Sequence, residues 1–198
     1  TVAQIAQICN IPIESLLGLP PAATHSSPLE TRDYAVAKNG IQFIYFDING
    51  CMVRFFQRAF SELAQETGTK PELIEDTFWH YNDAVCRGEM PLEEFNKVLG
   101  ERIGKRDLSW ADYYMRNVDP ITEMQECARW ASQYFRIGLL SNIMPGFITI
   151  MIREGLLPDL PYASIIDSSV VGAIKPEPEI YHIAEQQAGV TESKILLV

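Results

Sequence analysis

The hydrophobic residues of this chain follow two alternating spacings. Short apolar runs, rich in β-branched and aromatic side chains, are typical of strands that are buried on both faces in a parallel sheet. These runs lie at residues 41–46, 134–140, 163–167 and 195–198. Between them, apolar residues at helical spacing predict helices over 124–130, 147–152 and 177–189. Repeated strand–helix units predict an α/β fold with a doubly wound parallel sheet.

The region between the first two predicted strands has only helical spacing. Phe56, Phe60 and Leu63 share one helical stripe, and Pro71 and Pro91 are suited to the first turns of two further helices. No strand pattern interrupts this stretch. We therefore predict an all-helical insertion over 55–116, placed between the two parts of an α/β core, 41–54 and 117–198.

The first forty residues have a different pattern from the predicted core. Val2, Ile5 and Ile8 follow helical spacing, and Ile13, Leu16 and Leu17 continue the apolar face. The stretch that follows is rich in Pro, Ser and Thr, which favour turns over helices. The sequence thus predicts a helical segment over 1–19 and a linker over 20–40.

Composition narrows the range of partners. Twenty-six acidic residues against 16 basic ones give a formal net charge of −10, a surface that repels the phosphates of nucleic acids. No apolar stretch approaches the roughly 20 residues of a membrane helix, and no signal peptide is apparent at the start. The four cysteines lie far apart and predict reduced thiols rather than a zinc site or disulfides. We expect a cytoplasmic protein without a membrane partner.

Polar residues follow three of the predicted strands or the loops after them. They are Asp47 with Asn49, Ser141 with Asn142, and Lys175. Each has an ordinary structural explanation: an Asp suits a turn, a Ser can cap a helix, and a Lys is usually solvated. However, strand ends of a doubly wound sheet open onto one crevice, so these groups can converge there. A carboxylate nucleophile with a hydroxyl, an amide and an ammonium group suits phosphoryl transfer.

The same segments resemble the motifs of the haloacid dehalogenase-like (HAD) hydrolase superfamily. The resemblance lies in 47–50 (Asp-Ile-Asn-Gly), 139–145 (Leu-Leu-Ser-Asn-Ile-Met-Pro) and 172–181 (Gly-Ala-Ile-Lys-Pro-Glu-Pro-Glu-Ile-Tyr). It points to the branch with a helical cap after the first strand, and 87–95 is similar to a helix of that cap. It spans 41–198 and implies a Rossmann-like core with 55–116 as the cap.

The resemblance implies a role for each residue of the three clusters. Asp47 matches the nucleophile that forms an aspartyl-phosphate intermediate, and Lys175 matches the lysine that stabilises the nucleophile and the transferring group. Ser141, and less closely Asn142, match the position that holds the phosphate. Asp47 and the main-chain carbonyl of Asn49 match ligands of Mg²⁺. The implied substrate is a small phosphorylated metabolite, which the cap selects and encloses.

Two departures from the family pattern bear on catalysis. Phosphatases of the family carry a general acid–base Asp at the position of Asn49, and the loss of such a group costs about 10²–10⁴ in rate. Asn49 therefore permits a slow phosphatase, another displacement, or an inactive relative. The acidic fourth motif would follow the strand that ends at Val198, so residues 1–198 are expected to bind Mg²⁺ poorly and to turn over slowly or not at all. Carboxylates in any sequence beyond Val198 would favour a metal-dependent enzyme.

A different class of function is also open. Residues 2–18 resemble the closing helices of a Cro/repressor-type helix-turn-helix domain, whose DNA-reading helix would precede Thr1. The alternative is thus a non-catalytic HAD-like module of a transcriptional regulator, which senses a ligand or forms a homodimer. In that case, these 198 residues contact no nucleic acid. Metal-independent dehalogenation is less favoured, because the aromatic residue usual at position 49 is missing.

Several further side chains are candidates for substrate contacts. Trp79, His80, Tyr81 and Arg87 lie in the predicted cap, where each could face the crevice or pack against neighbouring helices. His25 in the linker and His182 on a predicted helix are expected to be incidental.

Overall fold

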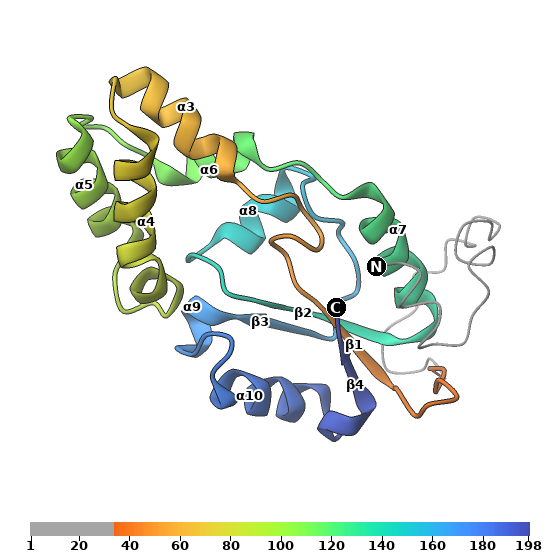
Figure 1. Ribbon diagram of the computed structural model, residues 1–198. Helices are drawn as coiled ribbons and strands as arrows, with labels where there is room; N and C mark the ends of the chain where they lie inside the picture. The colour runs from red at the N-terminus through yellow and green to blue at the C-terminus, as the bar shows by residue number, and fades with distance from the viewer. Residues whose placement is uncertain (1–33) are drawn as a thin grey trace.

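The computed structural model describes residues 34–198 (Figure 1). The predicted segment 1–19 and linker residues 20–33 lie outside the described residues. The strands are β1 (Phe43–Phe46), β2 (Arg136–Ser141), β3 (Ser164–Asp167) and β4 (Ile195–Leu197). The helices are α3 (Gln57–Thr67), α4 (Pro71–Cys86), α5 (Leu92–Ile103), α6 (Trp110–Asn117), α7 (Thr122–Tyr134), α8 (Phe147–Arg153), α9 (Ser168–Val171) and α10 (Pro178–Ala188), with a short 3₁₀ turn, η2 (Glu192–Lys194), before β4.

The described strands form one parallel sheet in the order β3-β2-β1-β4. In the register of this sheet, Tyr45 lies beside Gly138, and Ser141 lies beside Asp167. A parallel sheet with strand–helix alternation is the fold class that the sequence predicted. Because all strands point the same way, their carboxyl ends share one edge of the sheet.

Helices cover both faces of this sheet (Figure 1). Ile44 and Phe46 of β1 belong to a core that also contains residues of α7 and α8, and Phe43 and Tyr45 belong to a second core with α10. The alternation follows from the two-residue repeat of a strand. All four β1 side chains are buried, as the apolar run predicted for a strand covered on both faces.

The segment between β1 and α7 consists of helices α3 to α6, with no strand among its described residues. These helices contribute a group of aromatic side chains to the same core as Ile44 and Phe46, and in this group the fully buried Trp110 stacks on Phe60 at a ring distance of 5.4 Å. Phe78 packs against both rings. Figure 1 shows this helical segment beside the sheet rather than on either of its faces.

The predicted boundaries differ from the observed ones mainly around β2. The strand predicted from residue 134 begins at Arg136, because α7 continues through Tyr134. The main-chain N–H of Phe135 still donates to the carbonyl of Ala131, which closes the last helical turn. The hydrophobic pattern does not separate helix α6 from the rest of the helical insertion, although Ser109 caps its first turn by accepting from the N–H of Asp112.

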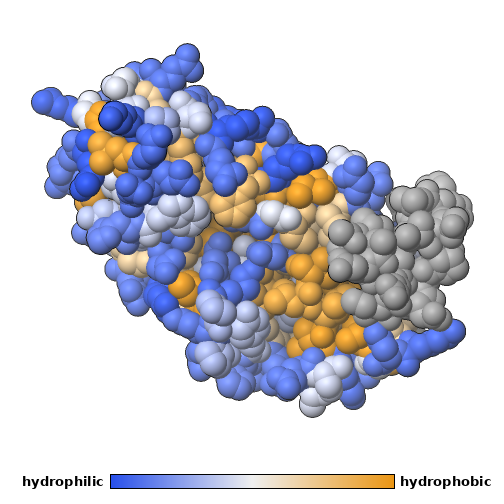
Figure 2. Space-filling model, in the orientation of Figure 1, coloured by the Kyte–Doolittle hydropathy of each residue, from blue (hydrophilic) through white to orange (hydrophobic). Residues whose placement is uncertain are grey.

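Apolar side chains gather on one part of the described surface. Figure 2 shows hydrophobic residues gathered on the viewed face, beside the C-terminal end of the described chain. A groove of about 460 Å³ lies between α10 and β4, and its lining includes Ile195, Leu197 and His182. Within residues 34–198, no helix is both long and apolar enough to cross a membrane.

Gly138 offers a test of the sheet register. A Cβ at this position would lie 2.6 Å from both the Ser164 carbonyl oxygen and the Tyr45 ring, because the ring occupies the space beside the glycine. We expect Gly138→Ala to lower the free energy of unfolding by about 1–3 kcal/mol, as overpacking does in a filled core. Denaturant unfolding measures this difference. Gln133→Ala, at an exposed position of α7, is the control, and an equal effect of the two changes would contradict the register.

Candidate functional site

An ion pair lies at the carboxyl edge of the sheet. The ammonium of Lys175, in the loop between α9 and α10, lies 2.7 Å from Oδ2 of Asp47, the residue after β1. The same ammonium donates to the carbonyl oxygen of Leu140 in β2, at 3.4 Å. The side chains of Lys175 and Asp47 are 18% and 29% exposed. Two of the predicted site residues are therefore in direct contact, and both are still reached by solvent.

The main chain fixes Asp47 at the end of its strand. Its N–H donates to the carbonyl of Val198 at 2.9 Å, and its Oδ1 accepts from the N–H of Ile48 at 2.8 Å. The loop then turns back on itself, since the N–H groups of Met52 and Val53 both donate to the Ile48 carbonyl. The carboxylate is thus positioned by its own backbone before any ligand arrives.

Asn142 positions Lys175 through two hydrogen bonds to its main chain. The amide oxygen accepts from the Lys175 N–H at 2.7 Å, and the amide nitrogen donates to the Lys175 carbonyl at 2.9 Å. The Asn142 amide is therefore used to attach the Lys175 loop to the end of β2. A phosphate-holding role, which the resemblance implied less closely for Asn142 than for Ser141, would have to share this amide.

The hydroxyl of Ser141 is buried and has no hydrogen-bond partner among the described residues. An unsatisfied buried hydroxyl costs about 1–3 kcal/mol, and such a group in a native protein calls for a functional explanation. Helix capping does not explain Ser141, since the N-cap of the following helix α8 is Gly146. Ser141 lies at the carboxyl end of β2, the strand next to β1, which bears Asp47.

Asn49 is held by a residue that sequence reasoning missed. The hydroxyl of Tyr114, on α6, donates a short hydrogen bond to the amide oxygen of Asn49. Burial raises the pKa of the Tyr114 hydroxyl well above its usual value, so the hydroxyl remains protonated and remains a donor. With its oxygen occupied in this way, the Asn49 side chain presents an N–H donor and no acid. In the sequence, Ser109 as a helix-capping residue indicates where α6 begins. Nothing in the sequence indicates that Tyr114 on this helix contacts Asn49.

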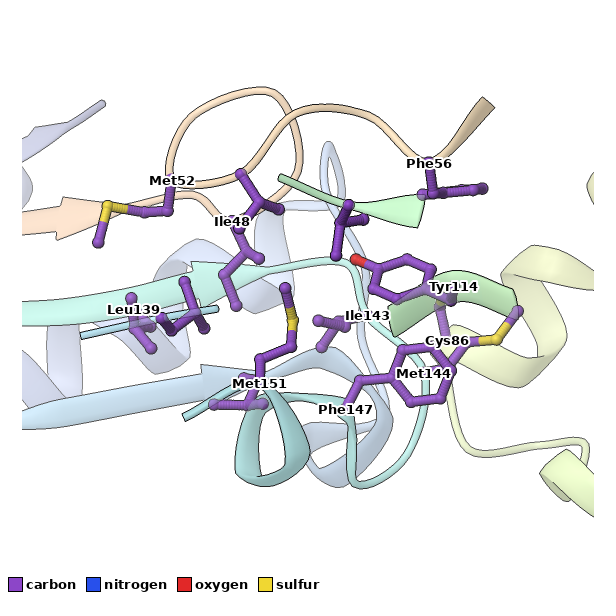
Figure 3. Close-up of a cluster of buried hydrophobic side chains, with 14 of the residues drawn as sticks. Ile48, Met52, Phe56, Cys86, Tyr114, Leu139, Ile143, Met144, Phe147 and Met151 are labelled. Carbon is purple, nitrogen blue, oxygen red and sulfur yellow. The ribbon is translucent and has the colours of Figure 1, made fainter. Parts of the chain in front are cut away.

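Apolar side chains surround these polar groups. Figure 3 shows Tyr114, Phe147 and Cys86 gathered beside the loop that carries Ile48 and Met52. The rings of Tyr114 and Phe147 meet edge to face at 4.8 Å. A small cavity of about 20 Å³, roughly the room for one water molecule, is lined by Asn49, Tyr114 and Asn142 among mostly apolar neighbours. The space beside Asn49 is therefore nearly filled.

The cysteines near the site are poor nucleophiles. Burial raises the pKa of the Cys86 thiol, which lines the small cavity, to about 12. Burial and the nearby Asp47 carboxylate raise the pKa of the Cys51 thiol to about 12 as well. Both thiols are protonated at neutral pH, and the reactive form of cysteine is the thiolate. Asp47 is therefore the stronger candidate for a nucleophile.

The candidates for substrate contact lie in different places. Arg87 does not reach into the cavity but forms a two-pronged ion pair with Glu177, two residues after Lys175. That hydrogen-bonded pair holds the pKa of the Glu177 carboxyl below its ordinary range. Gly88 packs so closely on the carbonyl of Ser169 that a Cβ would lie 2.4 Å from it. The end of α4 is thus in contact with α9 and with the loop that carries Lys175.

The other candidates are more exposed or lie away from Asp47. Trp79 is partly exposed and contacts Phe55 and Phe56, while the rings of His80 and Tyr81 meet at 4.6 Å. His182 lines the groove between α10 and β4. His25 lies outside the described residues.

The described residues do not by themselves complete a magnesium site. Within 34–198, no group of three or more His, Cys, Asp or Glu side chains is placed to hold a metal ion. Asp47 supplies one carboxylate, and this carboxylate is already paired with Lys175. A hard cation such as Mg²⁺ needs several oxygen ligands, so the donor set here is too small.

Known structures share this fold. No protein-family model matches the chain, and no curated protein matches it. A variant of a HAD family enzyme from Bacteroides thetaiotaomicron, in complex with magnesium and inorganic phosphate, superimposes with a TM-score of 0.66 at 18% identity, over 80% of this chain and 84% of that one. A predicted HAD-like family hydrolase from Porphyromonas gingivalis gives a TM-score of 0.63 at 20% identity, over 79% and 80%.

An L-2-haloacid dehalogenase from Xanthobacter autotrophicus, with chloropropionic acid covalently bound, is similar at a TM-score of 0.60 and 18% identity, over 79% of this chain and 69% of that one. At these identities the similarity establishes the fold. The resemblance found in the sequence motifs and the similarity found in the structure therefore agree on a HAD-like fold.

Replacing Tyr114 tests its hold on Asn49. We expect Tyr114→Phe to lower the free energy of unfolding by about 1–3 kcal/mol, because the Asn49 oxygen loses its donor in a place with almost no room for water. Chemical denaturation measures the loss. Tyr181→Phe, on the exposed face of α10, should change stability by less than about 0.5 kcal/mol. Indistinguishable stabilities of the two variants would show that the Tyr114 bond is unimportant.

Proposed function

We propose that this chain, with its HAD-like fold, is a hydrolase that transfers a phosphoryl group from a small phosphorylated metabolite to Asp47. The observation that carries this proposal is the contact of Lys175 with Asp47, next to a strand end whose Ser141 hydroxyl is buried without a partner. A carboxylate, an ammonium and a hydroxyl without a partner, all at one sheet edge, suit an anionic group that arrives between them.

The first step uses side chains that the fold has already placed. An Asp47 carboxylate oxygen attacks the phosphorus, a bond from Asp47 to phosphorus forms, and the bond from phosphorus to the leaving oxygen breaks. Lys175 lies close enough to offset the negative charge of both the carboxylate and the transferring group. Ser141 donates its hydroxyl to a phosphoryl oxygen and so gains the partner that it lacks. Water then attacks the phosphorus, and the bond from phosphorus to the Asp47 oxygen breaks. The products are the free Asp47 carboxylate and inorganic phosphate, which keeps the protons of the water.

Asn49 limits which substrates can react. A leaving alkoxide needs a proton, and an amide cannot supply one at neutral pH. A leaving group that is stable as an anion, such as a phenolate, departs without such help. The water that cleaves the intermediate also has no carboxylate base at position 49. We therefore expect good leaving groups to be favoured and the second step to be slow.

No step in this scheme passes through a metal, because the described donors do not complete a magnesium site. The helical segment α3–α6 is proposed to act as the cap that selects the substrate. Its attachment through Arg87 and Glu177 places it beside the Lys175 loop.

A second candidate function is a ligand-sensing or dimerising module without catalysis. The observation that favours it is the hydrogen bond from Tyr114 to Asn49. Asn49 stands where phosphatases of the family carry their acid–base Asp, and here its amide oxygen is used in a structural contact. In this case, the edge with Asp47 and Lys175 would bind an anion without cleaving it.

Phosphatase activity on an aryl phosphate separates the two candidates. We expect slow hydrolysis by the full-length protein and a gain of about 10²–10⁴ for Asn49→Asp, because a carboxylate restores the proton transfer. Assays with and without Mg²⁺ show whether a metal contributes. Asp47→Asn in the Asn49→Asp background is the control and should abolish the gain. If neither the natural protein nor Asn49→Asp cleaves the ester, phosphoryl hydrolysis is the wrong class.

Ser141→Ala should weaken ligand binding without lowering the stability of the fold. Removing a buried hydroxyl that has no partner is expected to leave the free energy of unfolding unchanged or to raise it. Binding of inorganic phosphate, measured by calorimetry, should weaken. Ser168→Ala is the matched control, since the equally buried Ser168 hydroxyl bonds both the N–H and the carbonyl of Ile143. That control should cost about 1–3 kcal/mol. Equal destabilisation by both changes would mean that Ser141 is structural.

A further inference from the structure

One face of α4 forms a wall beside the candidate site. Trp79, Asn82 and Cys86 are spaced three and four residues apart, so they lie on the same side of the helix. Asn82 and Cys86 line the small cavity together with Asn49 and Asn142. Trp79 therefore lies on the same side of α4 as Asn82 and Cys86, about one turn before Asn82.

Aromatic residues from the loop after β1 face this end of the wall. Phe56 lines the small cavity, and Phe55 stacks on it with ring centroids 4.9 Å apart. The Phe55 ring also lies 6.4 Å from that of Trp79, and its edge is 3.9 Å from where a Cβ of Gly50 would be. Phe55 and Trp79 are thus in contact with Phe56, a lining residue of the cavity, and Phe55 lies beside Gly50 in the loop that follows Asp47.

Phe55 and Trp79 differ from the other Phe and Trp residues of the helical segment in being exposed. Phe60, Phe78 and Trp110 of the same segment are buried in its core, whereas Phe55 is 39% exposed and Trp79 is 44% exposed. The indole N–H of Trp79 has a partner, since it donates to Glu75 at 3.3 Å. Two neighbouring aromatic residues are therefore partly open to solvent, and one of them, Phe55, lies beside the loop that carries Asp47 and Asn49.

We propose that Phe55 and Trp79 form a specificity surface for a flat aromatic group of the substrate. The proposal rests on the function above, with the phosphate of the same molecule at Asp47, Ser141 and Lys175. An aromatic leaving group is also the kind that departs without the proton that Asn49 cannot give. Stacking on exposed rings gives a few-fold to about tenfold in affinity.

The test compares equilibrium binding of phenylphosphonate and methylphosphonate to the full-length protein by calorimetry. Neither compound can be hydrolysed, so binding is measured whether or not the protein is an enzyme. We expect phenylphosphonate to bind more tightly, and we expect Trp79→Ala and Phe55→Ala to weaken it about three- to tenfold while methylphosphonate is unaffected. Tyr134→Ala, an exposed aromatic residue on α7, is the matched control and should change neither affinity.

A second measurement needs no substitution. Of the three tryptophans, Trp110 and Trp130 are buried, so Trp79 is the one that acrylamide should quench readily. Phenylphosphonate should protect this fluorescence, and methylphosphonate should not.

Three results would contradict the proposed aromatic surface. They are equal affinities for the two phosphonates, equal weakening of both by Trp79→Ala, and no protection of the Trp79 fluorescence from acrylamide by phenylphosphonate. These outcomes are independent of turnover. If phenylphosphonate binds as expected while no aryl phosphate is cleaved, the surface is right and the hydrolase is wrong. If Asn49→Asp hydrolyses aryl phosphate but Trp79→Ala leaves phenylphosphonate affinity unchanged, the hydrolase is right and the surface is wrong.

Discussion

The ion pair of Asp47 and Lys175 requires two distant parts of the chain to meet at one edge of the sheet. Asp47 follows β1, and Lys175 comes 128 residues later, in the loop before α10. Partly buried charges are stable together only when their geometry is maintained. Asn142 provides this by binding both main-chain polar groups of Lys175, and the turn at Ile48 provides it for Asp47. Because β1 and β2 are neighbouring parallel strands, Asn142 after β2 and the turn at Ile48 after β1 lie at the same edge of the sheet.

Residues at strand ends could be predicted from the sequence because the sheet itself brings them together. Asp47, Ser141 and Lys175 were found in this way, since each follows an apolar run or the loop after one. The buried, unpaired state of the Ser141 hydroxyl could not be predicted, because it depends on every neighbouring side chain. The two hydrogen bonds between the Asn142 amide and the main chain of Lys175 could not be predicted for a similar reason, because they depend on the exact path of the loop.

Contacts between the helical segment and the core were the least predictable. Tyr114 reaches Asn49, and Arg87 reaches Glu177, across 65 and 90 positions of sequence. Helical spacing shows which side of a helix is apolar, but not how that helix is placed against a sheet. The pattern therefore identified Arg87 and Trp79 as candidates without distinguishing an ion-pair residue from an exposed ring. In the structure, Arg87 attaches α4 to the Lys175 loop, and Trp79 remains partly exposed to solvent.

The most direct test of Asp47 as the nucleophile is to trap its phosphorylated form. Without a carboxylate at position 49, an aryl phosphate can still donate its phosphoryl group, but the intermediate has no base to speed its hydrolysis. It should therefore accumulate. Peptide mass spectrometry after acid quenching of the full-length protein should find the phosphoryl group on the peptide that contains Asp47, and none in Asp47→Asn. Detectable turnover of the ester with an unmodified Asp47 peptide, or a phosphoryl group on another residue, would contradict this assignment.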